Sequence, residues 1–230
     1  THLDYIEKCA LAGAETVLLC ETALPYPLNE VPDHVIKLSL IAEEYKISIL
    51  VGSLENDGEN QYNAIYRFNP DGSLDKENYK KRRLVPFGEY VPMRGFIDAV
   101  LPFLSDISML DKDVTPGTDT AIFDTGSAKI GSIICFDSIY ENLSIDSVRD
   151  GADLLAISTN DSWFGDSRAA YMHTAQARLR SVELSRYTVR SANTGLSCSI
   201  TSTGEIADSL PILKGGYLIC EVKVMESRTL

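Results

Sequence analysis

Three short stretches of this chain are apolar on both faces of the strand that each would form. They read VLLC at 17–20, SILVG at 48–52 and DLLAIS at 153–158. A strand without apolar–polar alternation is covered on both sides, which is typical of sheets enclosed by other layers. Helical patterns lie between these stretches, so the chain is expected to form one α/β domain with a mostly buried, mixed sheet system.

The remaining patterns supply the covering helices and the connecting hairpins. Helical spacing predicts helices at residues 3–12, 32–47 and 169–187, the second with Asp33 as its candidate cap. Turn residues predict hairpins over 63–81 and 120–135, and two strands with a Thr203-Gly204 turn over 188–210. The run YLICEVKV at 217–224 predicts a final strand.

The composition excludes several classes of function. The net charge is −12 over 230 residues, and the one basic cluster is Lys80–Arg83, so a nucleic-acid surface is not expected. No apolar run approaches 18 residues, so no membrane-spanning helix is predicted within the chain. The five cysteines are widely spaced without a C-x-x-C pair, which disfavours a disulfide framework and a metal site.

Three of the apolar strands end in an abrupt polar step. Glu21 follows the first, Cys135 follows the run 130–134, and Asn160-Asp161 follows the third. Ligand sites in open α/β folds lie beyond the carboxyl ends of strands, so these ends could meet in one site. Each step alone is better explained as the polar exit that every buried strand needs, and only the set of them together with the loop at 79–92 favours a site.

A shaped loop at 79–92, YKKRRLVPFGEYVP, adds a lysine and a second glutamate. Its two prolines and its glycine exclude a helix, and it brings Lys80 or Lys81 together with Glu89. Glutamate, lysine and cysteine form a complete set for nucleophilic catalysis. The cysteine attacks as a thiolate, the glutamate moves its proton, and the ammonium stabilises an oxyanion.

A cysteine–histidine pair is the weaker alternative. His2 lies at the start of the chain, His34 near a helix start and His173 within a predicted helix. None of them follows an apolar strand, so His173 is interpreted as a packing or hydrogen-bonding residue.

Together these segments resemble a known enzyme family. ETALP at 21–25, LVPFGEYVP at 84–92, ICFDSIYEN at 134–142 and STNDSWFG at 158–165 are similar to the nitrilase-type domain of the bacterial apolipoprotein N-acyltransferases. These belong to the nitrilase, or carbon–nitrogen hydrolase, superfamily. The resemblance runs nearly from end to end, and it implies a four-layer α-β-β-α sandwich with mixed sheets.

The resemblance also implies an activity and a set of roles. A phospholipid would give its acyl chain to Cys135 as a thioester, and the N-terminal amino group of a diacylglyceryl-cysteine lipoprotein would accept it. Glu21 would be the general base, Lys81 the oxyanion-stabilising lysine and Glu89 a supporting glutamate. No cofactor and no metal are implied.

The chain departs from the family after its cysteine and at its two ends. Phe136 and Asp137 stand where the family commonly has Tyr and Glu, which affects the positioning of substrate. The family also has an N-terminal strand, a C-terminal tail and a multi-helix membrane portion that this sequence lacks. Residues 1–230 are therefore expected to be one catalytic domain, truncated at both ends, from an enzyme of the bacterial cell membrane whose catalytic domain faces the extracytoplasmic side.

Two alternatives share the same residues. A soluble amidase or nitrilase-type hydrolase would use the same Glu-Lys-Cys set, with water replacing the amine. A binding module that has kept the fold and lost activity is disfavoured, because all three catalytic residue types are present.

Overall fold

The computed structural model describes residues 2–94 and 113–225. Its helices are α1 (His2–Leu11), α2 (Pro32–Tyr45), α5 (Glu141–Arg149) and α6 (Arg168–Leu184), with short 3-10 helices η1 (Leu28–Glu30), η2 (Cys135–Ile139) and η3 (Ser162–Phe164). Its strands are β1 (Thr16–Leu18), β2 (Leu24–Pro27), β3 (Ser48–Asn56), β4 (Gln61–Phe68), β5 (Tyr79–Lys80), β6 (Ile122–Asp124), β7 (Lys129–Ile134), β8 (Leu154–Asn160), β9 (Tyr187–Asn193), β10 (Cys198–Ile200) and β11 (Ile206–Ser209).

The strands form two mixed sheets. The first has the order β1-β3-β4-β5, and β2 also pairs with β3. The second has the order β11-β10-β9-β8-β7-β6, with β7, β8 and β9 parallel to one another. Every strand of the first sheet precedes residue 81 and every strand of the second follows residue 121, so each sheet is built from one half of the described chain.

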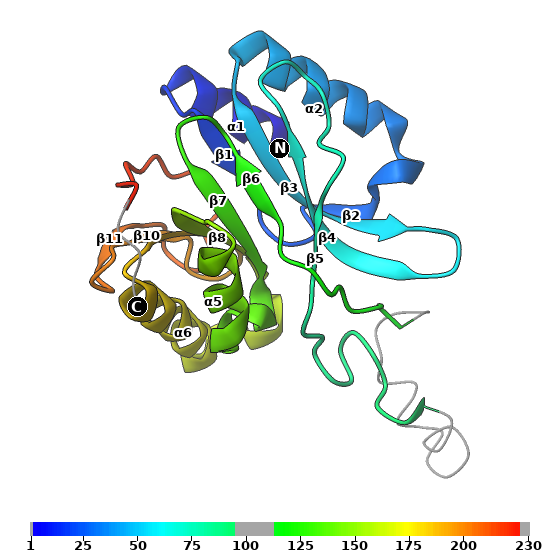
Figure 1. Ribbon diagram of the computed structural model, residues 1–230, viewed down its shortest axis with the longest axis vertical. Coiled ribbons are helices and arrows are strands. Elements are labelled where there is room, and N and C mark those ends of the chain that lie inside the picture. Colours follow the sequence, from blue (N-terminus) through cyan, green and yellow to red (C-terminus); the bar gives the residue numbers. More distant parts are fainter. Residues whose placement is uncertain (1, 95–112, 226–230) are drawn as a thin grey trace.

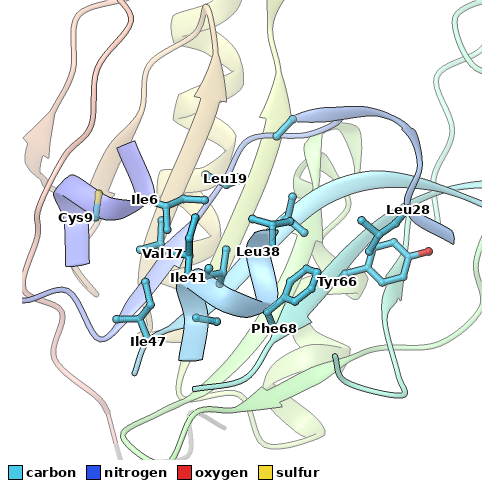
Figure 2. Close-up of a cluster of buried hydrophobic side chains, with 14 of the residues drawn as sticks. Ile6, Cys9, Val17, Leu19, Leu28, Leu38, Ile41, Ile47, Tyr66 and Phe68 are labelled. Carbon is cyan, nitrogen blue, oxygen red and sulfur yellow. The ribbon is translucent and has the colours of Figure 1, made fainter. Parts of the chain in front are cut away.

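The two sheets and the helices stack in four layers (Figure 1). Helices α1 and α2 cover the outer face of the first sheet, and their apolar side chains meet those of β1, β3 and β4 (Figure 2). A second core fills the space between the sheets and includes Leu50, Ile65, Ile134 and Ala156. A third lies where α5 and α6 cover the second sheet. The predicted α/β architecture with mixed sheets is confirmed.

The first residues of α6 and α2 differ in how the helix is capped. Ser167 caps α6, since its hydroxyl accepts a hydrogen bond from the amide of Ala169 at 3.2 Å. The prediction of Asp33 as the cap of α2 is wrong. The helix begins at Pro32, whose fixed φ suits the first helical position, so Asp33 lies within the first turn and Val31 takes the cap position without a side-chain bond. None of the helices in the described ranges has the length and apolarity that a membrane crossing needs.

The predicted final strand is also wrong. Residues 217–224 form no strand, although Leu218, Cys220 and Val222 are apolar at alternate positions, as in a strand. A strand needs a neighbour with a free edge, and no described strand pairs with this segment. Upstream, residues 187–209 form three strands rather than the two expected, with the turn at Thr203-Gly204 as predicted.

Candidate active site

Cys135 is the first residue after strand β7 and opens the 3-10 turn η2. Its φ of +46° lies in the left-handed region, which a residue with a Cβ adopts only where its surroundings enforce it. The side chain is buried between the two sheets. The chain therefore bends sharply at the point where the predicted nucleophile lies.

Glu21 lies three residues beyond β1 and is only 5% exposed. Its Oε1 accepts hydrogen bonds from Nδ2 of Asn63 at 2.7 Å and from Nζ of Lys81 at 2.9 Å. Its Oε2 accepts from the backbone amide of Asn160 at 2.7 Å. Glu21 thus joins the first sheet to the carboxyl end of β8 in the second.

Lys81 directly follows β5 and is 2% exposed. Its ammonium donates to Glu21 and to Oε1 of Glu89, both at 2.9 Å. Glu89 is held in turn by the backbone amide of Val85 at 2.8 Å and by Asn63 at 3.2 Å. Lys80 points elsewhere and pairs with Glu55 at 3.0 Å. Spacing alone did not show which of the two lysines lies beside Glu21 and Glu89, and the structure places Lys81 there.

The charges of Glu21 and Lys81 act directly on the cysteine. Burial, and then the negative charge of Glu21, raise the pKa of the Cys135 thiol to about 12, while the charge of Lys81 and a hydrogen bond from Thr159 oppose this rise. Burial works against the ammonium of Lys81, but Glu21, Cys135 and Glu89 outweigh it and hold its pKa well above the usual value. The resting thiol is protonated at neutral pH and needs a base to become a nucleophile.

Asp137 and Phe136 do not share one role. Asp137 is fully buried and accepts hydrogen bonds from the Tyr79 hydroxyl at 2.9 Å and from the Arg83 amide at 2.7 Å. Asp137 therefore joins the segment that carries Lys81 to the turn that carries Cys135. Burial raises the pKa of Asp137 to about 6, against the opposing charge of Lys81 and these hydrogen bonds. Phe136 packs edge-on against the ring of Tyr140, with centroids 5.4 Å apart.

A second buried network lies on the other side of Cys135. Nδ1 of His173 is 2.9 Å from Oδ1 of Asp161, and Oδ2 of Asp161 accepts from Arg190 at 2.6 Å. Nε2 of His173 lies 3.2 Å from the carbonyl oxygen of Cys135. The interpretation of His173 as a hydrogen-bonding residue is confirmed.

Arg190 was not predicted from the sequence, and neither was Asn63. Both lie within strands, where a single polar residue resembles an ordinary solvent-facing position.

One cluster in the described ranges has the donor types of a metal site. Ligand atoms of Cys135, Asp161 and His173 all lie within 4.8 Å of one another. Two features work against a cation there. The guanidinium of Arg190 already neutralises Asp161, and both nitrogens of His173 face protein partners. The donor set therefore suits a hydrogen-bond network better than a resident metal.

A cavity of about 850 Å³ opens along β1, between α1 and the segment 210–222. Leu18, Val189 and Ile219 are among its lining residues, which do not include Glu21, Lys81 or Cys135. This hollow is separate from the candidate catalytic group.

Sequence comparison places the chain in a family. Residues 1–229 match the carbon-nitrogen hydrolase family. The chain belongs to that family. Among curated carbon–nitrogen hydrolase relatives, the "Apolipoprotein N-acyltransferase" of Geobacter metallireducens is 36% identical over 227 residues, covering 97% of this chain and 43% of the relative. The protein of that name from Neisseria meningitidis serogroup B is 32% identical, covering 95% of this chain and 45% of the relative. The chain thus spans less than half the length of these relatives.

Solved structures of carbon–nitrogen hydrolases share the fold. An amidase from Nesterenkonia sp. superposes with a TM-score of 0.71 at 16% identity, over 93% of this chain and 80% of the amidase. A carbon-nitrogen hydrolase from Helicobacter pylori G27 superposes with a TM-score of 0.69 at 14% identity, over 92% and 79%. The nitrilase-like sandwich expected from the resemblance is confirmed.

Proposed function

We propose that this chain is the catalytic domain of an N-acyltransferase. It would move an acyl chain from a phospholipid, through a thioester on Cys135, to the N-terminal amino group of a diacylglyceryl-cysteine lipoprotein. Residues 1–230 would form one domain of a longer protein of the bacterial cell membrane, on its extracytoplasmic face. The names of the relatives support this activity, and the burial of Glu21 and Lys81 beside Cys135 supports the chemistry.

The first half-reaction acylates the cysteine. Glu21 takes the thiol proton as Sγ attacks the ester carbonyl carbon of the donor, and Lys81 stabilises the oxyanion that forms. Collapse of the tetrahedral intermediate breaks the carbon–oxygen ester bond. The lysophospholipid then leaves as an alcohol, with the proton that Glu21 returns to it.

The second half-reaction restores the enzyme. The amine of the lipoprotein attacks the thioester carbonyl carbon, and Glu21 takes a proton from the attacking nitrogen. Collapse breaks the carbon–sulfur bond, and the proton returns to Sγ. The products are an amide and a free thiol, so neither an oxidant nor a cofactor is consumed.

The observation that carries this proposal is the buried group of Glu21, Lys81 and Cys135, in which the ammonium of Lys81 donates to Glu21 at 2.9 Å. Burial and the charge of Glu21 raise the pKa of the Cys135 thiol, so attack on an ester at neutral pH requires a base, and the Glu21 carboxylate is the base that we propose. Lys81 adds a fixed cation beside the same sulfur, where an oxyanion would form.

The test uses the full natural protein in detergent, incubated with phospholipid and analysed by intact-protein mass spectrometry. We expect an added acyl mass on Cys135, absent from Cys135→Ala and strongly reduced in Glu21→Gln. Glu44→Gln, an exposed position on α2, is the control and should acylate like the unmodified protein. An adduct that persists in Cys135→Ala would refute the proposal. An adduct formed only with small amides would instead favour the amidase alternative.

A further inference from the structure

The backbone of Cys135 is held by groups other than Glu21 and Lys81. Its carbonyl oxygen accepts a hydrogen bond from the hydroxyl of Ser138 at 2.7 Å and faces Nε2 of His173 at 3.2 Å. Both partners are buried. Since φ of Cys135 is +46°, these two bonds act on a residue whose left-handed conformation needs support.

The proton positions follow from the hydrogen-bond partners. The carbonyl of Cys135 only accepts, and the hydroxyl of Ser138 donates its proton to that carbonyl. Both oxygens facing Nε2 of His173 are therefore acceptors, so Nε2 carries a proton and donates. The imidazole is thereby fixed by the nucleophile's own backbone.

The far side of the imidazole is equally constrained. Nδ1 lies 2.9 Å from Asp161, whose other oxygen accepts from Arg190 at 2.6 Å, and all three residues are buried. The hydroxyl of Thr159 donates to Oδ1 of Asp161 at 3.0 Å. A Cβ at Gly195 would collide with the Asp161 carboxylate, so the carboxylate is packed directly against backbone.

We propose that His173, Asp161 and Arg190 are positioning residues that fix the left-handed conformation of Cys135 and so aim Sγ at Glu21 and Lys81. Arg190 anchors Asp161, Asp161 orients the imidazole, and His173 holds the carbonyl oxygen of Cys135. This role rests on the proposed function, because it requires Cys135 to be the nucleophile. It is distinct from base catalysis, since the nitrogens of His173 bond to groups other than Sγ.

The test measures acylation of Cys135 by mass spectrometry over a range of phospholipid concentrations, in the full natural protein. His173→Leu removes the donor, and we expect its maximal rate to fall about 100-fold, the scale of a 1 Å misplacement of a reacting group. The half-saturating donor concentration should stay unchanged, because both ring nitrogens of His173 face protein groups. His173→Gln restores a donor at the ε position, and it should recover most of the rate.

Thr174→Val is the matched control, since Thr174 is the buried neighbour of His173 on α6 and its hydroxyl bonds only within the helix, to Ala170 at 3.1 Å. It should acylate at the unmodified rate. The proposal is overturned if folded His173→Leu keeps that rate, or if His173→Gln is equally impaired. If His173→Leu does not fold, Asp161→Asn decides: a rate below that of Thr174→Val supports the proposal, and an unchanged rate overturns it. Failure of the unmodified protein to acylate Cys135 would refute the proposed function itself.

Discussion

Asn63 is the residue that balances the charges around Lys81. Two carboxylates share one ammonium, and the amide of Asn63 donates to both of them, at 2.7 Å to Glu21 and 3.2 Å to Glu89. A buried carboxylate without enough hydrogen-bond donors is costly, and this neutral side chain supplies one donor to each of the two glutamates.

Asn63→Asp tests this balance by replacing the donating amide with a third carboxylate of the same shape. We expect a loss of about 3 kcal/mol in the free energy of unfolding. The new carboxylate removes a donor from Glu21 and Glu89 and adds a buried negative charge that no further cation compensates. Urea unfolding of the full natural protein measures it. Asn56→Asp is the matched control, since its amide donates to Glu30 at 2.9 Å in an exposed setting, and it should cost well under 1 kcal/mol. Equal losses in both variants would contradict the prediction.

Asp137 makes stability depend on pH in mild acid. Its pKa rises from 3.8 to about 6 on folding, mainly through burial, so the folded protein binds the extra proton between these values. The protonated carboxyl of Asp137 therefore stabilises the folded protein below about pH 4, and this stabilisation is lost as the pH rises to about 6. The loss is up to about 3 kcal/mol.

Asp137→Asn should remove this component, because an amide does not titrate. The midpoint of urea unfolding, measured at pH 4, 5 and 6, should fall less steeply with rising pH than in the unmodified protein. Asp166→Asn, at an exposed loop position, should leave the slope unchanged. A parallel slope in Asp137→Asn would show that other groups cause the dependence.

At the scale of elements, strand β3 positions the turn that carries Glu21. Gly52 of β3 faces this turn, and a Cβ there would collide with the carbonyl oxygen of Cys20 and lie 2.9 Å from Cα of Glu21. Contacts this short force backbone to move, because no flexible side chain is available to give way. The close approach of β3 therefore sets the position of Glu21, the proposed general base.

Gly52→Ala should displace Glu21 and lower the rate of Cys135 acylation by about 100-fold while the protein still folds. The rate is measured by mass spectrometry, and folding by circular dichroism. Gly215→Ala is the control, since its Cβ would meet only the Tyr5 hydroxyl, at 3.5 Å. An unchanged rate in Gly52→Ala would show that the turn accommodates the methyl group.

The sequence predicted those parts of the site that follow buried strands. Glu21, Cys135 and Asp161 each end an apolar run, and the structure brings them together. Lys81 required the resemblance, because two adjacent lysines are equivalent by spacing. Asn63 and Arg190 could not be found, since their partners are 17 or more residues away in the chain and only tertiary packing shows them.

The segment 217–224 shows a different limit. Its alternating apolar residues predict a strand correctly as a local preference, but a strand forms only beside another with a free edge. Strand β1 pairs only with β3 among the described strands, and the cavity of about 850 Å³ separates it from this segment.

At the scale of the molecule, we expect the isolated 230-residue chain to be poorly stable, because an unpaired edge beside an apolar hollow leaves backbone groups and side chains without partners. Urea unfolding should be broad, and acylation of Cys135 incomplete. Cooperative unfolding and complete thioester formation by the 230-residue chain would refute this expectation.

Each sheet is built from a different half of the chain, so the residues of the candidate active site are divided between the two halves. Glu21 and Lys81 come from the half that builds the first sheet, and Cys135, Asp161 and His173 from the half that builds the second. Two separate polypeptides, one for each half, would hold base and nucleophile apart until they associate. Activity would then be second order in fragment concentration, which makes thioester formation a direct reporter of docking between the halves.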